Sequence, residues 1–310
     1  MAAPQPGILL EENAHTLYLV LRAKARANPR ALLKACAQAP ALTESLARQH
    51  PKAALRCTVA IGRGLLTKGA GWPQSPARLA DLKPIHGKAG NVPHTPADLL
   101  FHIGSTRHDL NVALAQTLLA EIGGLAEVRE EVAGFRYLDS RDLTGFIDGT
   151  ANPKGRERAD AALIGREDRA FVGGSYVLIQ RFVHDLDSWS RLSQKRQEAA
   201  IGRTKDKSVE LEGKKKLSTA HISRVEIDGP DGKELAIVRH SMPYGAASGE
   251  KGLFFIAYAK DAAIFNAMLA RMFGVGDDGL SDRLMAFTKP VTGAILFVPS
   301  LATLRQFSRL

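Results

Sequence analysis

Three side chains that could carry chemistry stand between residues 148 and 239 of the sequence: Asp148, His221 and Arg239. A carboxylate can move a proton, an imidazole can bind a metal, and a guanidinium can stabilise negative charge. Each type also has a plainer use. Aspartate before glycine is common in turns, arginine in a strand commonly forms a surface ion pair, and a lone histidine is more often structural than a ligand. Residue type alone therefore leaves the chemistry open.

Asp148 belongs to the segment GFIDGTANP at residues 145–153, inside a stretch (138–170) without sustained helical or alternating periodicity. Such long stretches in compact proteins are usually functional or disordered. Glycine lets the backbone approach a ligand closely, and the apolar pair Phe146 and Ile147 resists simple solvation. We therefore expect a binding loop here, with a plain connector as the alternative.

Two similar series of elements flank this loop. In the first half the pattern predicts strands at 18–21, 54–61, 99–104 and 133–138, a helix that begins after Asn28, and a helix over 105–124. In the second half it predicts strands at 175–182, 221–227, 252–259 and 293–299, and helices over 187–200 and 261–274. Each half thus has the β-α-β-β-α-β order of a ferredoxin-like unit.

This order predicts an α+β fold of two ferredoxin-like domains, duplicated in the manner of a dimeric α+β barrel. The expected domains are residues 1–138 and 171–310, joined by the loop 139–170 that carries GFIDGTANP. A length of 310 residues also favours two domains.

Composition narrows the class of protein. The net charge is +10, but the basic residues are dispersed and the densest stretch (205–216) contains acids and no aromatic residue, so we expect no nucleic-acid partner. We expect no membrane span and, from the N-terminal residues, no secretion signal, which predicts a cytoplasmic protein. Cys36 and Cys57 suggest core packing and neither a disulfide framework nor a thiolate metal site.

Taken together, these residues resemble the dye-decolourising peroxidases, and within them the cytoplasmic B-type group. GFIDGTANP contains the Gly-x-x-Asp-Gly signature of that family, and His221 and Arg239 follow Asp148 by 73 and 91 residues. The segments 252–259 (GLFFIAYA) and 287–301 (FTKPVTGAILFVPSL) are also similar to the B-type group. The resemblance covers nearly the whole chain.

The resemblance implies one haem b per subunit, with His221 as the axial ligand of the iron and with Asp148 and Arg239 on the opposite face. Histidine is a common haem ligand, and an acidic partner on its other ring nitrogen strengthens it as a donor. We expect Asp282 to be that partner, although Asp277 and Asp278 are close in sequence. Asp148 would move a proton between the peroxide oxygens, and Arg239 would stabilise the charge that develops.

Further residues are implied around the haem. Leu253 and Phe255 alternate with their neighbours in an expected strand, so they should point to one side and line the pocket. Gly149 and Thr150 should bring backbone against the haem edge. Some B-type members carry asparagine where this chain has Ser241, which leaves the orientation of peroxide open.

The implied activity is a peroxidase that reduces hydrogen peroxide and oxidises dyes, phenols or porphyrinogens in one-electron steps, with small anionic donors favoured by the positive charge. A haem-handling protein for porphyrin storage, transfer or iron removal is the alternative, and a basic nucleic-acid module that has lost haem is a third. The pair Asp148 and Arg239 separates the first from the second, because transport alone would not require it.

Three further expectations concern relays, histidines and assembly. Trp72, Trp189 and the tyrosines could relay electrons, although packing is the plainer role. The other histidines considered are interpreted as structural or surface residues: His102, His108, His184 and His240. We expect a homo-oligomer. The final residues, SLATLRQFSRL, show no linker and cargo peptide of the encapsulin type, so encapsulin loading is not expected.

Overall fold

The computed structural model describes residues 2–10, 13–67, 74–229 and 232–310, and Trp72 lies outside these residues. The first half forms β1 (His15–Ala23), α1 (Pro29–Gln49), β2 (Arg56–Ile61), α2 (Arg63–Thr67), β3 (Ile85–Gly87), β4 (Gly90–Val92), β5 (Leu99–Ser105), α3 (His108–Ile122) and β6 (Ala126–Phe135). The predicted cap is present: the Asn28 side chain accepts a hydrogen bond of 3.0 Å from the Arg30 amide at the start of α1.

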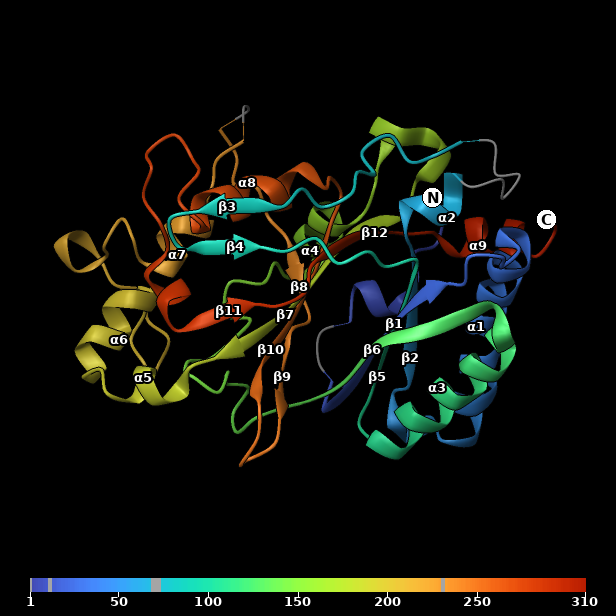
Figure 1. The fold of residues 1–310 in the computed structure, drawn as a ribbon, viewed down its shortest axis with the longest axis horizontal. Coiled ribbons are helices and arrows are strands. Elements are labelled where there is room, and N and C mark those ends of the chain that lie inside the picture. The colour runs from blue at the N-terminus through green and yellow to red at the C-terminus, as the bar shows by residue number, and fades with distance from the viewer. Residues whose placement is uncertain (1, 11–12, 68–73, 230–231) are drawn as a thin grey trace.

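The second half contains more and shorter elements. They are α4 (Gly155–Ala162), β7 (Ser175–His184), α5 (Leu186–Ser190), α6 (Gln194–Ile201), α7 (His221–Val225), β8 (Val238–Arg239), β9 (Met242–Gly245), β10 (Lys251–Ala259), α8 (Ala263–Met272), β11 (Thr288–Pro290), β12 (Ala294–Val298) and α9 (Leu301–Phe307). Figure 1 shows α1 and α3 on one side of the molecule and α5 to α8 on the other.

One antiparallel sheet unites the two halves. Among the described residues its order is β11-β7-β12-β2-β5-β1-β6-β9-β10-β8, and a further pairing between β7 and β10 closes it. The halves meet where Phe297 lies opposite Ile61 and where Gly134 lies opposite Tyr244. The predicted α+β class is confirmed, and the sheet is barrel-like.

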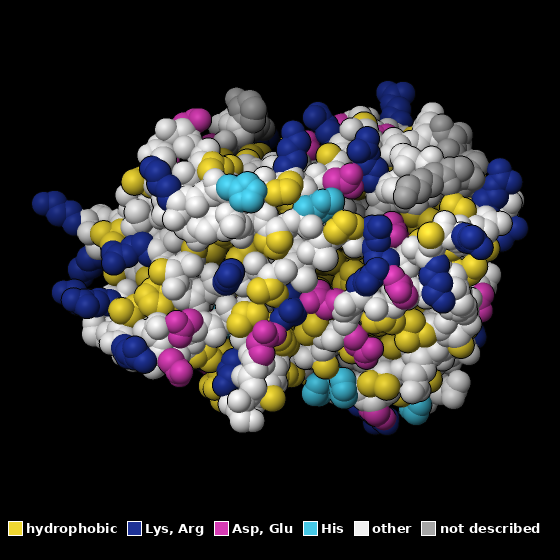
Figure 2. Space-filling view, in the orientation of Figure 1, with side chains coloured by type: hydrophobic (Ala, Val, Ile, Leu, Met, Phe, Trp, Pro, Cys, Tyr) yellow, Lys and Arg dark blue, Asp and Glu magenta, His cyan; other side chains and the backbone are white. Residues whose placement is uncertain are grey.

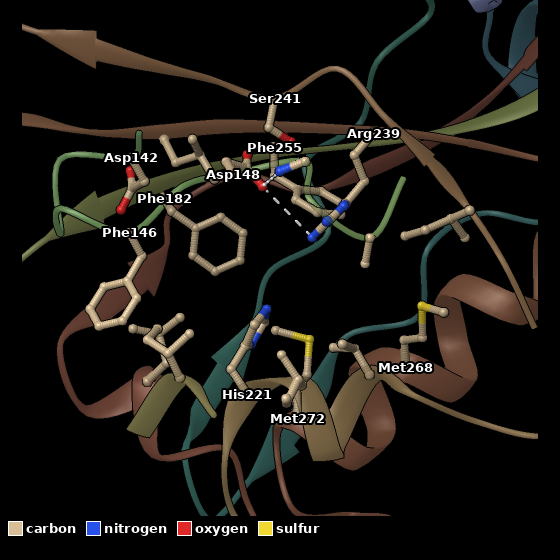
Figure 3. A pocket seen from close by; sticks show the side chains of 18 of the residues that line it. Asp142, Phe146, Asp148, Phe182, His221, Arg239, Ser241, Phe255, Met268 and Met272 are labelled. Carbon is tan, nitrogen blue, oxygen red and sulfur yellow. Dashed lines mark hydrogen bonds and ion pairs between the residues drawn. The ribbon is translucent and has the colours of Figure 1, made fainter. Parts of the chain in front are cut away.

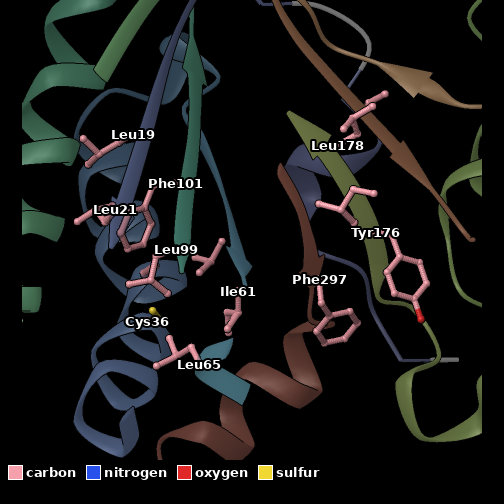
Figure 4. Close-up of a cluster of buried hydrophobic side chains, with 14 of the residues drawn as sticks. Leu19, Leu21, Cys36, Ile61, Leu65, Leu99, Phe101, Tyr176, Leu178 and Phe297 are labelled. Carbon is pink, nitrogen blue, oxygen red and sulfur yellow. The ribbon is translucent and has the colours of Figure 1, made fainter. Parts of the chain in front are cut away.

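Closure gives each strand an inner and an outer face, because successive side chains point to opposite sides. Val20, Phe254, Ile256 and Tyr258 lie in the cluster inside the closed sheet and are at most 4% exposed. The outer face of the first half packs under α1 and α3, and Figure 4 shows Leu19, Leu21 and Phe101 in this layer. Each fully buried side chain of this size contributes about 1.5–3 kcal/mol.

The segment 221–227 is a short helix followed by two residues without regular structure, so the strand predicted there is wrong. Helix α7 covers His221–Val225. Its apolar residues Ile222 and Val225 are three positions apart, a spacing that also fits one face of a helix. Arg224 is 1% exposed and pairs with Asp278, which fixes this short helix in place.

Three other boundaries differ from the prediction. The helix expected over 187–200 is two helices, because Ser193 between them has extended backbone and begins α6. The strand expected at 133–138 ends at Phe135, and Leu138 lies beyond it with a φ of +49°. The loop 139–170 contains α4, whose buried face is too narrow to give a clear periodicity.

Membrane insertion through a helix finds no support in the described part of the chain. None of its helices combines the length and the apolar character that a membrane span requires.

Candidate functional site

His221 stands at the start of α7, and a carboxylate holds its ring. Its Nδ1 lies 2.6 Å from Oδ2 of Asp282, whose side chain is fully buried. The other carboxylate oxygen of Asp282 accepts a bond of 2.8 Å from the Leu284 amide. A carboxylate in this place can accept a hydrogen bond that Nδ1 of His221 donates. The lone pair of Nε2 is then available, and no described residue bonds to it.

Helix α7 is anchored by two arginines. Arg224 bonds both carboxylate oxygens of Asp278, at 2.6 and 2.8 Å, and this pairing lowers the pKa of Asp278 to about 2. Arg271 of α8 donates to the carbonyl oxygens of Ser223 and Glu226. Of the three aspartates near 280, Asp282 therefore contacts the histidine, and Asp278 fixes the helix that carries it.

Asp148 and Arg239 come together from distant parts of the chain. Their side chains approach to 3.8 Å, and both are about three-quarters buried. The Asp148 amide donates to the Ser140 carbonyl, and Oδ1 of Asp148 accepts from the Gly149 amide at 2.6 Å. Arg239 lies on β8 opposite Ala257 of β10. Loop 145–152 and the closed sheet thus set the two charges side by side.

Asn152 links this loop to the strand that carries Arg239. Its Oδ1 accepts a bond of 2.9 Å from the Arg239 amide, and its Nδ2 donates a bond of 2.8 Å to the Arg239 carbonyl. The sequence analysis missed this contact, because nothing in the spacing shows that residues 87 positions apart would pair.

A single cavity separates His221 from the pair of charges. In Figure 3 the His221 ring points into it from one side, and Asp148 and Arg239 lie on the opposite side. Part of the space that the two sides enclose is continuous with solvent. The predicted residues Gly149, Thr150, Leu253, Phe255 and Ser241 also line it.

The walls of the cavity are mainly apolar. Phe146 and Phe182 lie toward one end and Met268 of α8 toward the other, while Phe255 and Met272 lie between them. Leu253 and Phe255 face the cavity, while the alternate residues Phe254 and Ile256 face the inside of the sheet. A flat apolar ligand with a few polar groups suits such walls.

Arg203 lies in the cavity wall and was not identified from the sequence. Arg203 donates to the Ser208 carbonyl at 2.9 Å and pairs with Glu210 at 3.2 Å. Among the described lining residues, Arg203 and Arg239 are the basic ones. Arg203 could therefore hold an anionic group of a ligand at the edge of the cavity.

His184 was interpreted as a structural or surface residue, and it lines the cavity. Its Nε2 lies 3.0 Å from Asp142 and its Nδ1 lies 2.7 Å from the Thr288 hydroxyl. Burial acts to raise the pKa of Asp142, but hydrogen bonds from His184 and Thr144 outweigh it and hold that pKa below its ordinary value. His184 ends a strand, and only the fold shows which way it points.

The other residues considered from the sequence lie away from the cavity. Trp189 is 3% exposed, packs beside Phe146 and Phe287, and donates to the Thr144 carbonyl at 2.9 Å. His102 is buried inside the closed sheet. Cys36 is buried and Cys57 is partly buried, and both thiols are free.

Comparison with known proteins matches both halves of the chain. The family model described as "Dyp-type peroxidase, N-terminal" matches residues 5–136, and the one described as "Dyp-type peroxidase, C-terminal" matches residues 139–303. The chain belongs to the Dyp-type peroxidase family. A dye-decolorizing peroxidase of Mycolicibacterium paratuberculosis is 39% identical over 261 residues, which are 84% of this chain and 73% of the relative.

Solved structures of Dyp-type peroxidases share the fold. A DypB variant of Rhodococcus jostii in complex with haem is 39% identical, covers 97% of this chain and 98% of its own, and has a TM-score of 0.93. The encapsulated Dyp-type peroxidase of Mycobacterium smegmatis is 34% identical, covers 98% of both chains, and has a TM-score of 0.93. The predicted family is confirmed, and the B-type group fits these relatives.

Proposed function

We propose that this chain is a haem peroxidase that binds one haem b in the cavity between His221 and the pair Asp148 and Arg239. The observation that carries the proposal is the arrangement of these residues around one cavity. The His221 imidazole, with a free Nε2, lies on one side, and the Asp148 carboxylate beside the Arg239 guanidinium lies on the other. The haem in the Rhodococcus DypB variant and the name of the mycobacterial relative support it.

The residues present fit a haem. Apolar side chains from β7, β10 and α8 suit the faces of a porphyrin, and Arg203 and Arg239 are placed to bind its carboxylate groups. Nε2 of His221 would hold the iron. Asp282 would accept a hydrogen bond from Nδ1, which would fix the tautomer of the ring and make Nε2 a stronger electron-pair donor to the iron.

When bound, haem supplies the electrons that reduce hydrogen peroxide and recovers them singly from a donor. The residues opposite His221 would handle the proton and the charge. Asp148 would accept a proton from one peroxide oxygen and return it to the other as water leaves. Arg239 would stabilise the negative charge on the departing oxygen through the N–H donors of its guanidinium.

Stopped-flow absorbance tests the proposal. The haem-loaded protein is mixed with one equivalent of hydrogen peroxide, beside the variants Asp148→Asn and Arg239→Leu. We expect a rapid Soret change in the unsubstituted protein, slowed in one or both variants by roughly 100-fold. A bound haem that ignores peroxide would refute the proposal and favour haem handling, in which metal-free porphyrin would be left behind.

The donor and the assembly are part of the same proposal. Dyes, phenols or porphyrinogens would be oxidised in one-electron steps, and the positive net charge would favour anionic donors. Basic and acidic side chains are interspersed on the face in Figure 2, which supports a small-molecule donor over nucleic acid. That the protein forms a homo-oligomer stays a prediction. A cytoplasmic location also stays a prediction, and the free thiols of Cys36 and Cys57 are consistent with it. The Mycobacterium smegmatis relative is described as encapsulated, so the expectation against encapsulin loading is not confirmed.

The duplicated organisation is also proposed. Each half would derive from one ferredoxin-like unit, with boundaries at residues 1–138 and 171–310 and the loop 139–170 between them. The order β1-α1-β2-β5-α3-β6 supports this for the first half. In the second half, α5 to α7 and the short strand β8 would be additions around the haem.

A further inference from the structure

Arg239 lies on a strand too short to fix it alone. Strand β8 has two residues, Val238 and Arg239, which pair with Tyr258 and Ala257 of β10. The next amide, of His240, donates to the Ile256 carbonyl. Because hydrogen-bonding directions alternate along a strand, the N–H and C=O of Arg239 point to the other side. A second strand would normally bond them there.

The side chain of Asn152 takes the place of that strand. Its carboxamide has one acceptor and two donors, and it bonds both the N–H and the C=O of Arg239, at 2.9 and 2.8 Å. Asn152 is itself fixed, because its own amide donates to the Gly149 carbonyl at 3.0 Å. It therefore ties the backbone of Arg239 to the loop 148–152 that carries Asp148.

We propose that Asn152 is a positioning residue that fixes the position of the Arg239 guanidinium relative to Asp148. It thereby sets the affinity for anions on the side of the cavity opposite His221. The inference rests on the proposed function. Asn152 need not touch haem or peroxide, because it acts through the main chain of Arg239. Without it, β8 would keep the bonds to β10 alone, and the guanidinium could move out of line with the 3.8 Å approach to Asp148.

Asparagine suits this position for a specific reason. Aspartate has nearly the same shape and could still accept from the Arg239 amide, but it could not donate to the Arg239 carbonyl. It would face that carbonyl oxygen with a second oxygen and add a negative charge. Asn152→Asp therefore breaks half of the contact without opening a hole, and Asn152→Ala removes both halves.

The test uses the haem-loaded protein and two readouts, the affinity for fluoride by Soret titration and the rate of reaction with peroxide. Fluoride is an anion that binds ferric haem and would be stabilised by a correctly placed guanidinium. The variants are Asn152→Asp, Asn152→Ala, Arg239→Leu and the double variant of Asn152→Ala with Arg239→Leu. Asn91→Asp, the same chemical change at an exposed position of β4, is the control.

We expect both Asn152 variants to weaken fluoride binding and slow the peroxide reaction by roughly 10- to 100-fold, as small displacements of a catalytic group do. In the Arg239→Leu background, Asn152→Ala should add less than about twofold, since the two residues act as one unit. Asn91→Asp should behave as the unsubstituted protein.

Any of three results would overturn the inference. Fluoride affinity and peroxide rate within about twofold of the unsubstituted protein in both Asn152 variants would show that Arg239 needs no such anchor. Full additivity in the double variant, or loss of the folded state in both Asn152 variants, would make Asn152 a general stability residue. Failure of the unsubstituted protein to bind haem or react with peroxide would instead refute the proposed function.

Discussion

In the first half of the molecule, side chains fill the space between the sheet and its helices, whereas in the second half the corresponding space is a cavity. Leu17, Leu19 and Leu21 of β1 are at most 2% exposed where they pack beneath α3. On the outer face of β10, Leu253 and Phe255 are only partly buried and face His221 across open space.

The difference shows how one architecture can serve two purposes. Both halves place helices over the outer face of a shared sheet, so stability and ligand binding use the same kind of interface. In the second half, short elements such as α7 stand away from the sheet, and the ion pair between buried Arg224 and half-exposed Asp278 holds α7. We infer that haem fills the cavity of the second half and packs against its walls as core side chains do in the first half.

Removing a large side chain from each half gives the sharpest contrast. In the haem-free protein, Phe101→Ala should lower the free energy of unfolding by roughly 3–5 kcal/mol, because Phe101 is fully buried. Phe255→Ala should lower it by less than about 1.5 kcal/mol, because its ring already borders the cavity. Urea unfolding measures both values. Equal losses would show that the second half is packed as tightly as the first.

Haem removal should affect the halves unequally. At a free haem concentration 100 times its dissociation constant, bound haem would stabilise the fold by about 2.7 kcal/mol. Hydrogen exchange followed by mass spectrometry should show faster exchange in α7, α8 and β10 without haem, and little change in α1 and α3. A uniform increase across the chain would contradict the comparison.

Acid should weaken the interior that the halves share. Burial lowers the pKa of His102 to about 3, aided by His240, and burial lowers the pKa of His240 to about 4. These values lie below the ordinary 6.5, so the unfolded chain binds protons more readily. The corresponding stability is present above pH 6.5 and is lost as pH falls toward 4, by up to a few kcal/mol.

Urea unfolding of the haem-free protein at several pH values measures this loss, and His102→Gln should flatten the dependence between pH 6.5 and 4. An unchanged pH profile in that variant would assign the acid sensitivity to other groups. Because His102 lies inside the closed sheet, both halves should respond together.

The smallest expected effect concerns the anchor of α7. Asp278→Asn removes the charge that pairs with buried Arg224, so haem affinity should fall by roughly tenfold through the loosened His221 helix. Asp81→Asn, at the exposed pair with Arg63, is the matched control and should change nothing. Haem titration followed at the Soret band compares them. Equal affinities in the two variants would separate this ion pair from the haem site.

The residues that the family resemblance singled out lie close together in the structure, and their roles stay predictions. Asp148, His221 and Arg239 converge on one cavity, and Asp282 contacts the histidine ring. The strands with strong apolar runs, such as β1, β7 and β12, were also placed within a few residues. These features depend on local pattern and on a resemblance that covers the chain.

The features that escaped prediction depend on contacts between distant segments. Helix α7 has an apolar spacing that fits either a strand or a helix, and the ion pair of its buried Arg224 with Asp278 decides between them. His184 and Arg203 line the cavity only because of where β7 and the loop after α6 lie. Closure of the sheet through β7 and β10 brings residues about 75 positions apart into register, and no local pattern encodes that pairing.

The most direct test of the central claim is a haem titration of the cofactor-free protein, followed by absorbance, with His221→Ala and His108→Ala in parallel. His108 also begins a helix, but it is exposed in the packed half. We predict stoichiometric binding in the unsubstituted protein and in His108→Ala, and at least about 100-fold weaker binding in His221→Ala. Equal affinity and an unchanged Soret band in His221→Ala would contradict the account.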